Sequence, residues 1–370
     1  MSHVTLAEWA QPQSRGRVDT IRGQKAGAMF RAAGVGDVAS VKRLAAEGVD
    51  VNLAGGRGAR PLHLAAERGH AVVVETLVEL GADKSAPDET AFTPLHCGAQ
   101  HGHVDVVVIL VECGANKEAV DVEGSRPLHS AAQQGHAAVV QTLVNHGADK
   151  EAAGPNGSNP LHLAAQHGFV EVIKVLVASG AHKEAKDQND GDTPLLRAAR
   201  EGHAEAIRVL ASLGANILAK TALRGTALHL AANIGGEEAI KALVLLGVDK
   251  EATDVDGVTP LHQAAFQGHV AATKTLVEMG ANIAARAPGG ETPLQLSITY
   301  GHHQVAQVLR GAHALERSAR TKQKAAVKEP TQQAIDQAER MAALVIAEEE
   351  REQVAAAKRK VRNCLTPTHR

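Results

Sequence analysis

Pro61-Leu62-His63-Leu64 is the first clear copy of a tetrapeptide that recurs along this chain of 370 residues. Successive copies start 33 residues apart, with one step of 34 residues before Pro194. A fixed period of this length indicates a repeat protein, in which each unit buries its apolar face only against its neighbours. The further copies are Pro94-Leu95-His96-Cys97, Pro127-Leu128-His129-Ser130, Pro160-Leu161-His162-Leu163, Pro194-Leu195-Leu196-Arg197, Ala227-Leu228-His229-Leu230, Pro260-Leu261-His262-Gln263 and Pro293-Leu294-Gln295-Leu296.

A degenerate copy, Ala28-Met29-Phe30-Arg31, lies one period before Pro61, so we count nine repeats between about residues 24 and 312. Each repeat predicts two short helices. A threonine before the proline, as at Thr93, can cap the first helix, with the proline at the first helical position. A glycine about eight residues later, such as Gly102, suits the left-handed residue that ends this helix.

A second helix follows in each repeat, and the loop after it leads into the first helix of the next repeat. Val73, Val74, Leu77 and Val78 follow helical spacing and predict a helix that ends at Gly81. The stretch after the second helix is polar and rich in turn residues, as in residues 148–157, and it suits a hairpin-like finger.

These units, with Thr-Pro-Leu-His-x-Ala-Ala, Gly-His and Leu-Val-x-x-Gly-Ala in register, resemble the ankyrin repeat over about 290 of the 370 residues. The resemblance implies an all-α solenoid of stacked helix-turn-helix units with hairpin fingers. It also implies that a protein partner binds along the concave face, which the fingers and the first helices build.

Outside the repeats we expect four further segments. Residues 1–23 form a disordered N-terminal segment, 313–329 a linker, 330–362 a charged helix and 363–370 a tail, around a repeat domain at 24–312. Ile335, Ala338, Ala342 and Val345 follow heptad spacing, but the pattern then meets Glu349, so any coiled coil is weak. The basic run at 358–362 resembles a nuclear-import signal; the alternative is that it complements the end of the helix.

Composition excludes several classes of protein. The formal net charge is −2, which argues against a general nucleic-acid binder. No stretch approaches 18 consecutive apolar residues, and the N-terminus lacks the apolar core of a secretory signal. Three cysteines without a paired spacing support neither a disulfide framework nor a zinc site. We therefore expect a soluble, monomeric protein of the cytoplasm, with the nucleus as a second compartment and no membrane partner.

The 20 histidines do not indicate a metal centre, because twelve of them recur once per repeat. Recurring residues stack along a solenoid, whereas a zinc site needs three or four ligands at one point. The glycines and Thr-Pro pairs have the same structural explanation, and no phosphate-binding loop is present. We expect no metal, no cofactor, no small-molecule substrate and no enzymatic activity.

The positions that the repeat pattern leaves free are candidates for partner contact. They are amide- and imidazole-rich in the middle of the chain, charged in one repeat, and apolar toward the C-terminal end. Exposed aromatic rings there are hot-spot candidates, although they could equally cover the neighbouring helix. The residues are Phe92, Gln100, His101, Gln133, Gln134, Gln166, His167, Arg197, Arg200, Ile234, Phe266 and Tyr300.

Two functional hypotheses follow. The first is a protein-binding scaffold or adaptor, and the alternative is a regulatory subunit or nuclear cofactor whose basic C-terminal helix carries the activity. One modification follows from the family resemblance: Asn52, in the first finger, resembles a substrate of asparaginyl hydroxylation. The alternative is an ordinary turn asparagine.

Overall fold

The computed structural model describes residues 17–328 and 332–364 of the chain. Within these ranges the protein is all-α, with 19 α-helices, labelled α2 to α20, and no strand. The first 16 residues of the expected N-terminal segment lie outside the described part, and the rest of that segment belongs to helix α2 (Arg17–Val35). The fingers are loops, with one isolated bridge between Lys220 and Thr226 and two short 3₁₀ turns, η1 (Gly56–Gly58) and η2 (Pro155–Gly157).

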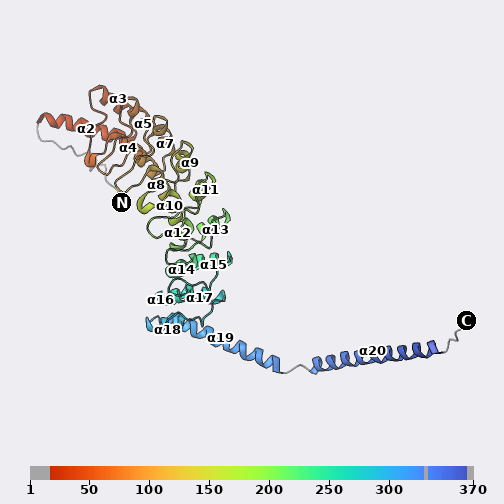
Figure 1. The fold of residues 1–370 in the computed structure, drawn as a ribbon. Helices are drawn as coiled ribbons and strands as arrows, with labels where there is room; N and C mark the ends of the chain where they lie inside the picture. Colours follow the sequence, from red (N-terminus) through yellow and green to blue (C-terminus); the bar gives the residue numbers. More distant parts are fainter. Residues whose placement is uncertain (1–16, 329–331, 365–370) are drawn as a thin grey trace, which may run out of the picture. The chain divides into compact units, whose positions relative to one another are not determined.

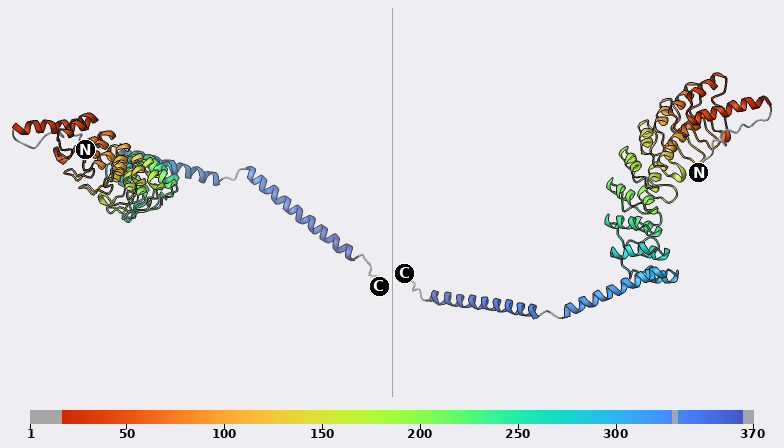
Figure 2. Two further views of the ribbon diagram at one scale, coloured as in Figure 1. Left: turned by 90° about the horizontal axis from the view of Figure 1, so that it is seen from above. Right: turned by 180° about the vertical axis from the view of Figure 1, so that it is seen from behind.

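Each repeat forms a pair of helices, and the pairs stack in chain order (Figures 1 and 2). The first helices lie on the inner side of the curve that the stack makes in Figure 1, and the second helices lie on the outer side. After α2 and α3 (Val38–Ala46), the first helices are α4 (Pro61–Glu67), α6 (Pro94–His101), α8 (Pro127–Gln133), α10 (Pro160–Gln166), α12 (Pro194–Arg200), α14 (Ala227–Ile234), α16 (Pro260–Gln267) and α18 (Pro293–Thr299). The second helices are α5 (Ala71–Glu79), α7 (Val104–Glu112), α9 (Ala137–Asn145), α11 (Val170–Ala178), α13 (Ala204–Ser212), α15 (Glu237–Leu245), α17 (Val270–Glu278) and α19 (His303–Lys328).

Local sequence explains where the helices begin and end. Thr93 accepts a hydrogen bond from the backbone N–H of His96 and so caps α6, with Pro94 at the first helical position. Gly102 ends α6 with a φ of 78°, a left-handed conformation that favours glycine. The capping threonine and the glycine therefore confirm the helix boundaries that the repeat predicted.

The core is thin and repeats from α4 to α16. In these repeats the leucine of the tetrapeptide is buried, as at Leu95 and Leu128, and one or two alanines of the first helix are buried beside it. Small side chains let neighbouring helices approach closely, which explains why the chain needs so few aromatic residues. In the degenerate first repeat, Met29 and Phe30 are buried and fill the same layer.

Helix α19 closes the stack with its first turns, where Val305, Ala306 and Leu309 are buried. It then continues to Lys328, so residues 313–328 are helical where we expected a linker. The reason is local: no proline stands between His303 and Pro330, and the intervening residues are mostly helix-forming.

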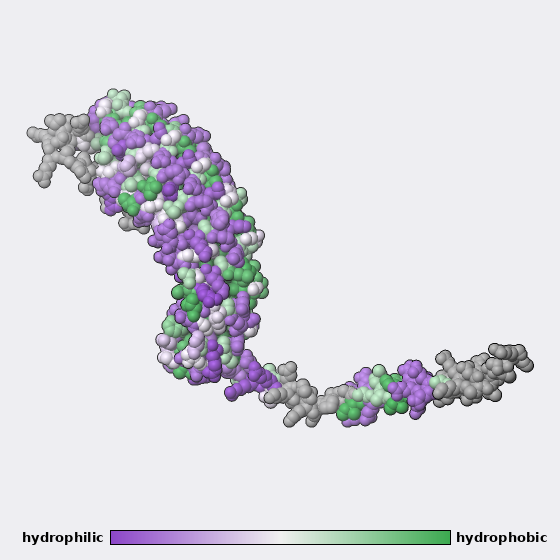
Figure 3. Space-filling model, in the orientation of Figure 1, coloured by the Kyte–Doolittle hydropathy of each residue, from purple (hydrophilic) through white to green (hydrophobic). Residues whose placement is uncertain are grey.

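Helix α20 (Gln332–Cys364) belongs, with the residues after Leu309, to a second unit of the chain. Its bounds agree within two residues with the charged helix expected at 330–362. The exposed apolar residues of α20, among them Ile335, Met341 and Val345, stand among charged ones (Figure 3). The weak coiled coil stays a prediction. None of the described helices is long and apolar enough to cross a membrane.

Candidate functional site

The residues that the repeat pattern leaves free form a row along the first helices. One or two lie at the C-terminal end of each helix from α6 to α18, as Gln100 and His101 do on α6 and Ile234 does on α14. Phe92 lies instead at the base of a finger, half-buried, with its ring centroid 4.7 Å from that of His96. The stacking of the repeats therefore brings residues about 33 positions apart in the sequence to one surface.

The first part of this row is polar. His101, Gln133, Gln134 and His167 are exposed, and Gln100 and Gln166 are half-buried. The ring of His101 is fixed through Nδ1, which lies 3.0 Å from the carbonyl oxygen of Cys97 on the preceding turn. These amides and imidazoles offer hydrogen-bond donors and acceptors at positions that the helices hold in place.

The last part of the row is apolar and aromatic. Ile234, Phe266 and Tyr300 are 45%, 39% and 53% exposed. The rings of Phe266 and Tyr300 meet edge to face, with centroids 4.6 Å apart and planes at 69°. This geometry is a favoured one for aromatic pairs. Each ring therefore packs against a neighbour and still presents much of its surface to solvent.

An amide cluster lies beside these rings. The side-chain oxygen of Asn233 accepts hydrogen bonds from Nε2 of Gln263 at 2.6 Å and from Nε2 of Gln267 at 2.7 Å. The cluster therefore links the first helices of two consecutive repeats.

The recurring histidines link the repeats. In the tetrapeptide of α6, Nδ1 of His96 accepts a hydrogen bond from the backbone N–H of Thr93, and Nε2 lies 3.2 Å from the carbonyl oxygen of Ser125 in the next finger. The histidine after the first helix points the other way: Nε2 of His136 lies 2.9 Å from the carbonyl oxygen of Gln100 in the preceding repeat. Where both kinds of histidine are present, they tie a repeat to the next one and to the one before.

Burial controls the charge of the tetrapeptide histidines. Desolvation lowers the pKa of His63 and of His129 to about 4, although hydrogen bonds to backbone carbonyl groups oppose the shift. Burial likewise lowers the pKa of His96, His162, His229 and His262. These imidazoles are neutral at pH 7, as their role as both donor and acceptor requires.

Arg197 and Arg200 have a structural role that the sequence pattern did not indicate. Arg197 is only 9% exposed, and its Nε donates to Oδ2 of the fully buried carboxylate of Asp187 at 2.7 Å. Arg200 donates from Nε, at 3.0 Å, and from Nη2 to Oδ2 of Asp192. Both acids belong to the finger that precedes α12, so these ion pairs hold a finger against its own helix.

The two buried carboxylates differ in their electrostatics. Burial opposes the ionisation of Asp187, but the backbone N–H of Asp190 and the guanidinium of Arg197 outweigh it and hold the pKa of Asp187 below its usual value. At Asp192 burial dominates over the attraction of Arg200 and raises the pKa. Oδ1 of Asp192 is buried without a hydrogen-bond partner in the described structure, which accounts for the difference.

A ladder of side chains joins the bases of the fingers and was also missed from the sequence. Oε1 of Glu118 accepts the backbone N–H of Asp149 at 2.9 Å, and Asn52 forms the first rung with Asp83. The amide of Asn52 also donates to the carbonyl oxygen of Gly81, so both of its polar atoms are engaged. Aligning the fingers at 33-residue spacing would have revealed the series, whose other rungs are Ser85, Glu151, Glu184 and Glu251. Hydroxylation of Asn52 stays a prediction.

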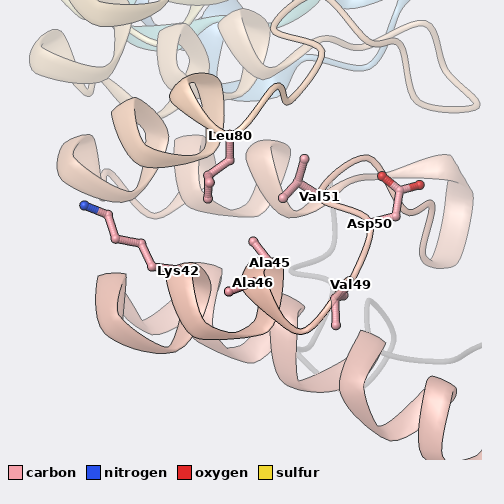
Figure 4. Close-up of a pocket in the computed structure, with 7 residues that line it drawn as sticks. All are labelled: Lys42, Ala45, Ala46, Val49, Asp50, Val51 and Leu80. Atoms are coloured by element: carbon pink, nitrogen blue, oxygen red, sulfur yellow. The ribbon is translucent and has the colours of Figure 1, made fainter.

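A shallow hollow of ≈ 390 Å³ lies on the second-helix side, away from the row of candidate residues (Figure 4). Ala45, one of its lining residues, stands where the next repeats carry the larger Val78 and Val111. Five of its seven lining residues are apolar, Lys42 and Asp50 are the charged ones, and the two charged side chains do not converge in it. In the described parts of the chain, no group of three His, Cys, Asp or Glu side chains is placed to hold a metal ion. Burial raises the pKa of the Cys97 thiol, which keeps it protonated and unreactive.

Comparison with known proteins finds a matching family model and similar solved structures. The family model for ankyrin repeats matches residues 29–121, 93–154, 128–221 and 228–318. Among solved structures, the human ASB11 ankyrin repeat domain is similar, with a TM-score of 0.55 and 31% sequence identity. That alignment covers 60% of this chain and 98% of the other. The search of curated proteins gave no match.

Proposed function

Because the chain belongs to the ankyrin-repeat family, whose repeats are protein–protein interaction modules, we propose that it is a non-catalytic scaffold or adaptor. It binds a protein partner on the concave face, along the row of residues at the ends of the first helices. The observation that carries the proposal is the exposed pair of Phe266 and Tyr300 beside Ile234. Rings on a preformed surface give large contact areas at a small entropic cost.

The polar part of the row supports the same function. Gln100, Gln133 and Gln166 occupy equivalent positions in three consecutive repeats, so their amides can bind successive polar groups of one partner. The helices fix these positions before binding, which reduces the entropy lost on association. Arg197 contributes indirectly by holding its finger in place, whereas the less buried Arg200 can also reach a partner.

The test is affinity capture from native lysate with the intact chain and with the double variant Phe266→Ala/Tyr300→Ala. We expect the variant to lose the partner while it stays folded, because the rings lie at the surface. Leu245→Ala is the matched control, since it removes an apolar side chain that is 81% exposed on the second helix α15. A partner lost from the control but kept by the double variant would place the binding surface on the outer side.

The alternative function places the activity in the C-terminal helix. Exposed apolar residues of α20, such as Met341 and Leu344, favour a role for this helix in contacting another protein. Truncation after Lys328 removes α20 and leaves α19 whole. A partner that survives this truncation supports the scaffold, and a partner that is lost supports a regulatory subunit or nuclear cofactor acting through α20.

A further inference from the structure

We infer that the repeat domain contains a hinge between the α12–α13 pair and the α14–α15 pair. The recurring histidines link the other successive pairs from α4 onward, and this joint alone among them has neither of its two histidines. The role of the hinge rests on the proposed function. That role is to set the angle between the polar and the aromatic parts of the binding surface. Its existence is independent of any partner.

The forward link is absent at this joint. Leu196 stands at the tetrapeptide position where His229, one repeat later, places Nε2 2.9 Å from the carbonyl oxygen of Val258. Leu196 is fully buried, so its contacts are apolar. Apolar contact is non-directional and does not fix the angle between two repeats as a hydrogen bond does.

The backward link is absent as well. Gly236 stands where His269, one repeat later, places Nε2 2.8 Å from the carbonyl oxygen of Asn233. At other joints the imidazole ring lies against a glycine of the preceding repeat: a Cβ on Gly102 would come within 2.6 Å of His136. Here no imidazole lies between the loops. A Cβ on Gly236 would lie 3.3 Å from the Cα of Gly202, and a Cβ on Gly202 would lie 3.8 Å from the side chain of Ile234.

Among the side-chain hydrogen bonds of the described residues, one remains across the joint, and it lies on the finger side. Oε1 of Glu184 accepts the backbone N–H of Asn216 at 2.7 Å. Nζ of Lys183 donates to the carbonyl oxygen of Leu213 at 2.6 Å, but this bond joins the finger before α12 to the end of α13 and does not cross the joint. The two repeats are therefore hydrogen-bonded to each other along their fingers, and no histidine links their helices. In a stack stabilised by nearest-neighbour contacts, this is the joint at which we expect separate opening.

The place of the hinge gives it a role in binding. The polar residues, from Gln100 to His167, lie before the joint, and Ile234, Phe266 and Tyr300 lie after it. A change of angle there moves the aromatic part of the surface relative to the polar part. A partner that contacts both parts selects one angle, which couples binding to the shape of the domain.

The test restores both histidines in the full chain with Leu196→His/Gly236→His. Gly236 has φ −72° and ψ 85°, close to the φ −84° and ψ 85° of His103, so a histidine fits the backbone there. Two hydrogen bonds of ordinary strength correspond to about a 30-fold change in an opening equilibrium. We expect hydrogen exchange of the amides in α14 and α16 to slow by about this factor.

Phe169→His is the matched control. It adds a backward histidine at the joint between α8–α9 and α10–α11, which His129 already links forward. We expect it to leave exchange in α14 and α16 unchanged. If Leu196→His/Gly236→His also leaves hydrogen exchange in these helices unchanged, the inference of a hinge is wrong.

A second variant tests the hinge even if the first folds poorly. His229→Leu/His269→Gly reproduces the unlinked joint one repeat later, and we expect it to speed exchange in α16 while α12 keeps its protection. Equal exchange in all helices of this variant would overturn the inference. Neither result depends on a partner. If the hinge is refuted, the proposed binding surface is still tested separately by the capture experiment.

Discussion

The repeats of α6–α7 and α12–α13 share one fold but hold their fingers by different chemistry. In the first, His96 bonds both to the start of its own helix and to the finger of the next repeat. In the second, Arg197 and Arg200 bond to acids of the finger that precedes their own helix. The difference teaches that stability within a repeat and connection between repeats are separate properties.

A side chain's length and charge explain this separation. A neutral imidazole has one donor and one acceptor on opposite sides, so one ring can satisfy two backbone groups in two repeats. A guanidinium in a buried place needs a carboxylate close by, and here the closest one lies in the same repeat. Where arginine–carboxylate pairs stand in place of the histidine, the finger keeps its position, but the hydrogen bond to the next repeat is lost.

The largest effect should come from breaking the buried ion pair. Asp187→Ala leaves the guanidinium of Arg197 buried without its carboxylate, which costs about 3–5 kcal/mol of unfolding free energy. Chemical denaturation followed by circular dichroism measures the loss. Asp190→Ala is the control. The carboxylate of Asp190 is half-exposed and forms a longer ion pair with Arg200, so its removal should cost below about 1 kcal/mol of unfolding free energy. Equal losses would show that burial of the pair is unimportant.

The next effect should come from acid. His63 and His129 have a pKa of about 4 when folded, below the ordinary value near 6.5, so the unfolded chain binds more protons between these values. The contribution of these histidines to the free energy of unfolding is therefore fully present above about pH 6.5. It falls as pH decreases, by about 2 kcal/mol for each of the two histidines from pH 7 to pH 5. Denaturation curves at both pH values measure it.

A histidine replacement sharpens this comparison. His129→Leu should have lower stability at pH 7 than the unchanged chain, and a smaller further loss at pH 5, because one proton-binding group is gone. Leu196→His should show the opposite, with a larger loss at pH 5. A loss at pH 5 that is the same in all three chains would assign the acid effect to other groups.

The smallest effect should come from the finger ladder. Leu218, which is 61% exposed, stands where Glu184 and Glu251 accept a backbone N–H from the next finger. Leu218→Glu should form this bond with the backbone of Asp249 and raise the unfolding free energy by about 1 kcal/mol. Glu251→Leu, which removes the following rung, should lower it by a similar amount. No change in either variant would show that the ladder contributes nothing to stability.

Much of the repeat domain could be predicted from local rules. Thr93 and Pro94 begin a helix and Gly102 ends it by their own conformational preferences, and the 33-residue period states which residues are stacked. The charged helix was also predicted, but its boundary with α19 was not, since no local signal separates residues 313–328 from a helix that starts at His303. The row of candidate contact residues followed from their equivalent positions.

The sequence by itself determined the repeat, the helix ends and the layer of leucine and alanine, because these depend on contacts within one unit and its identical neighbour. Tertiary structure alone decided that Arg197 is a buried partner of Asp187 and that Phe266 meets Tyr300 edge to face. Each of these depends on which side chains meet across fingers and helices. The direction and burial of a side chain, unlike its period, are fixed only when the stack has formed.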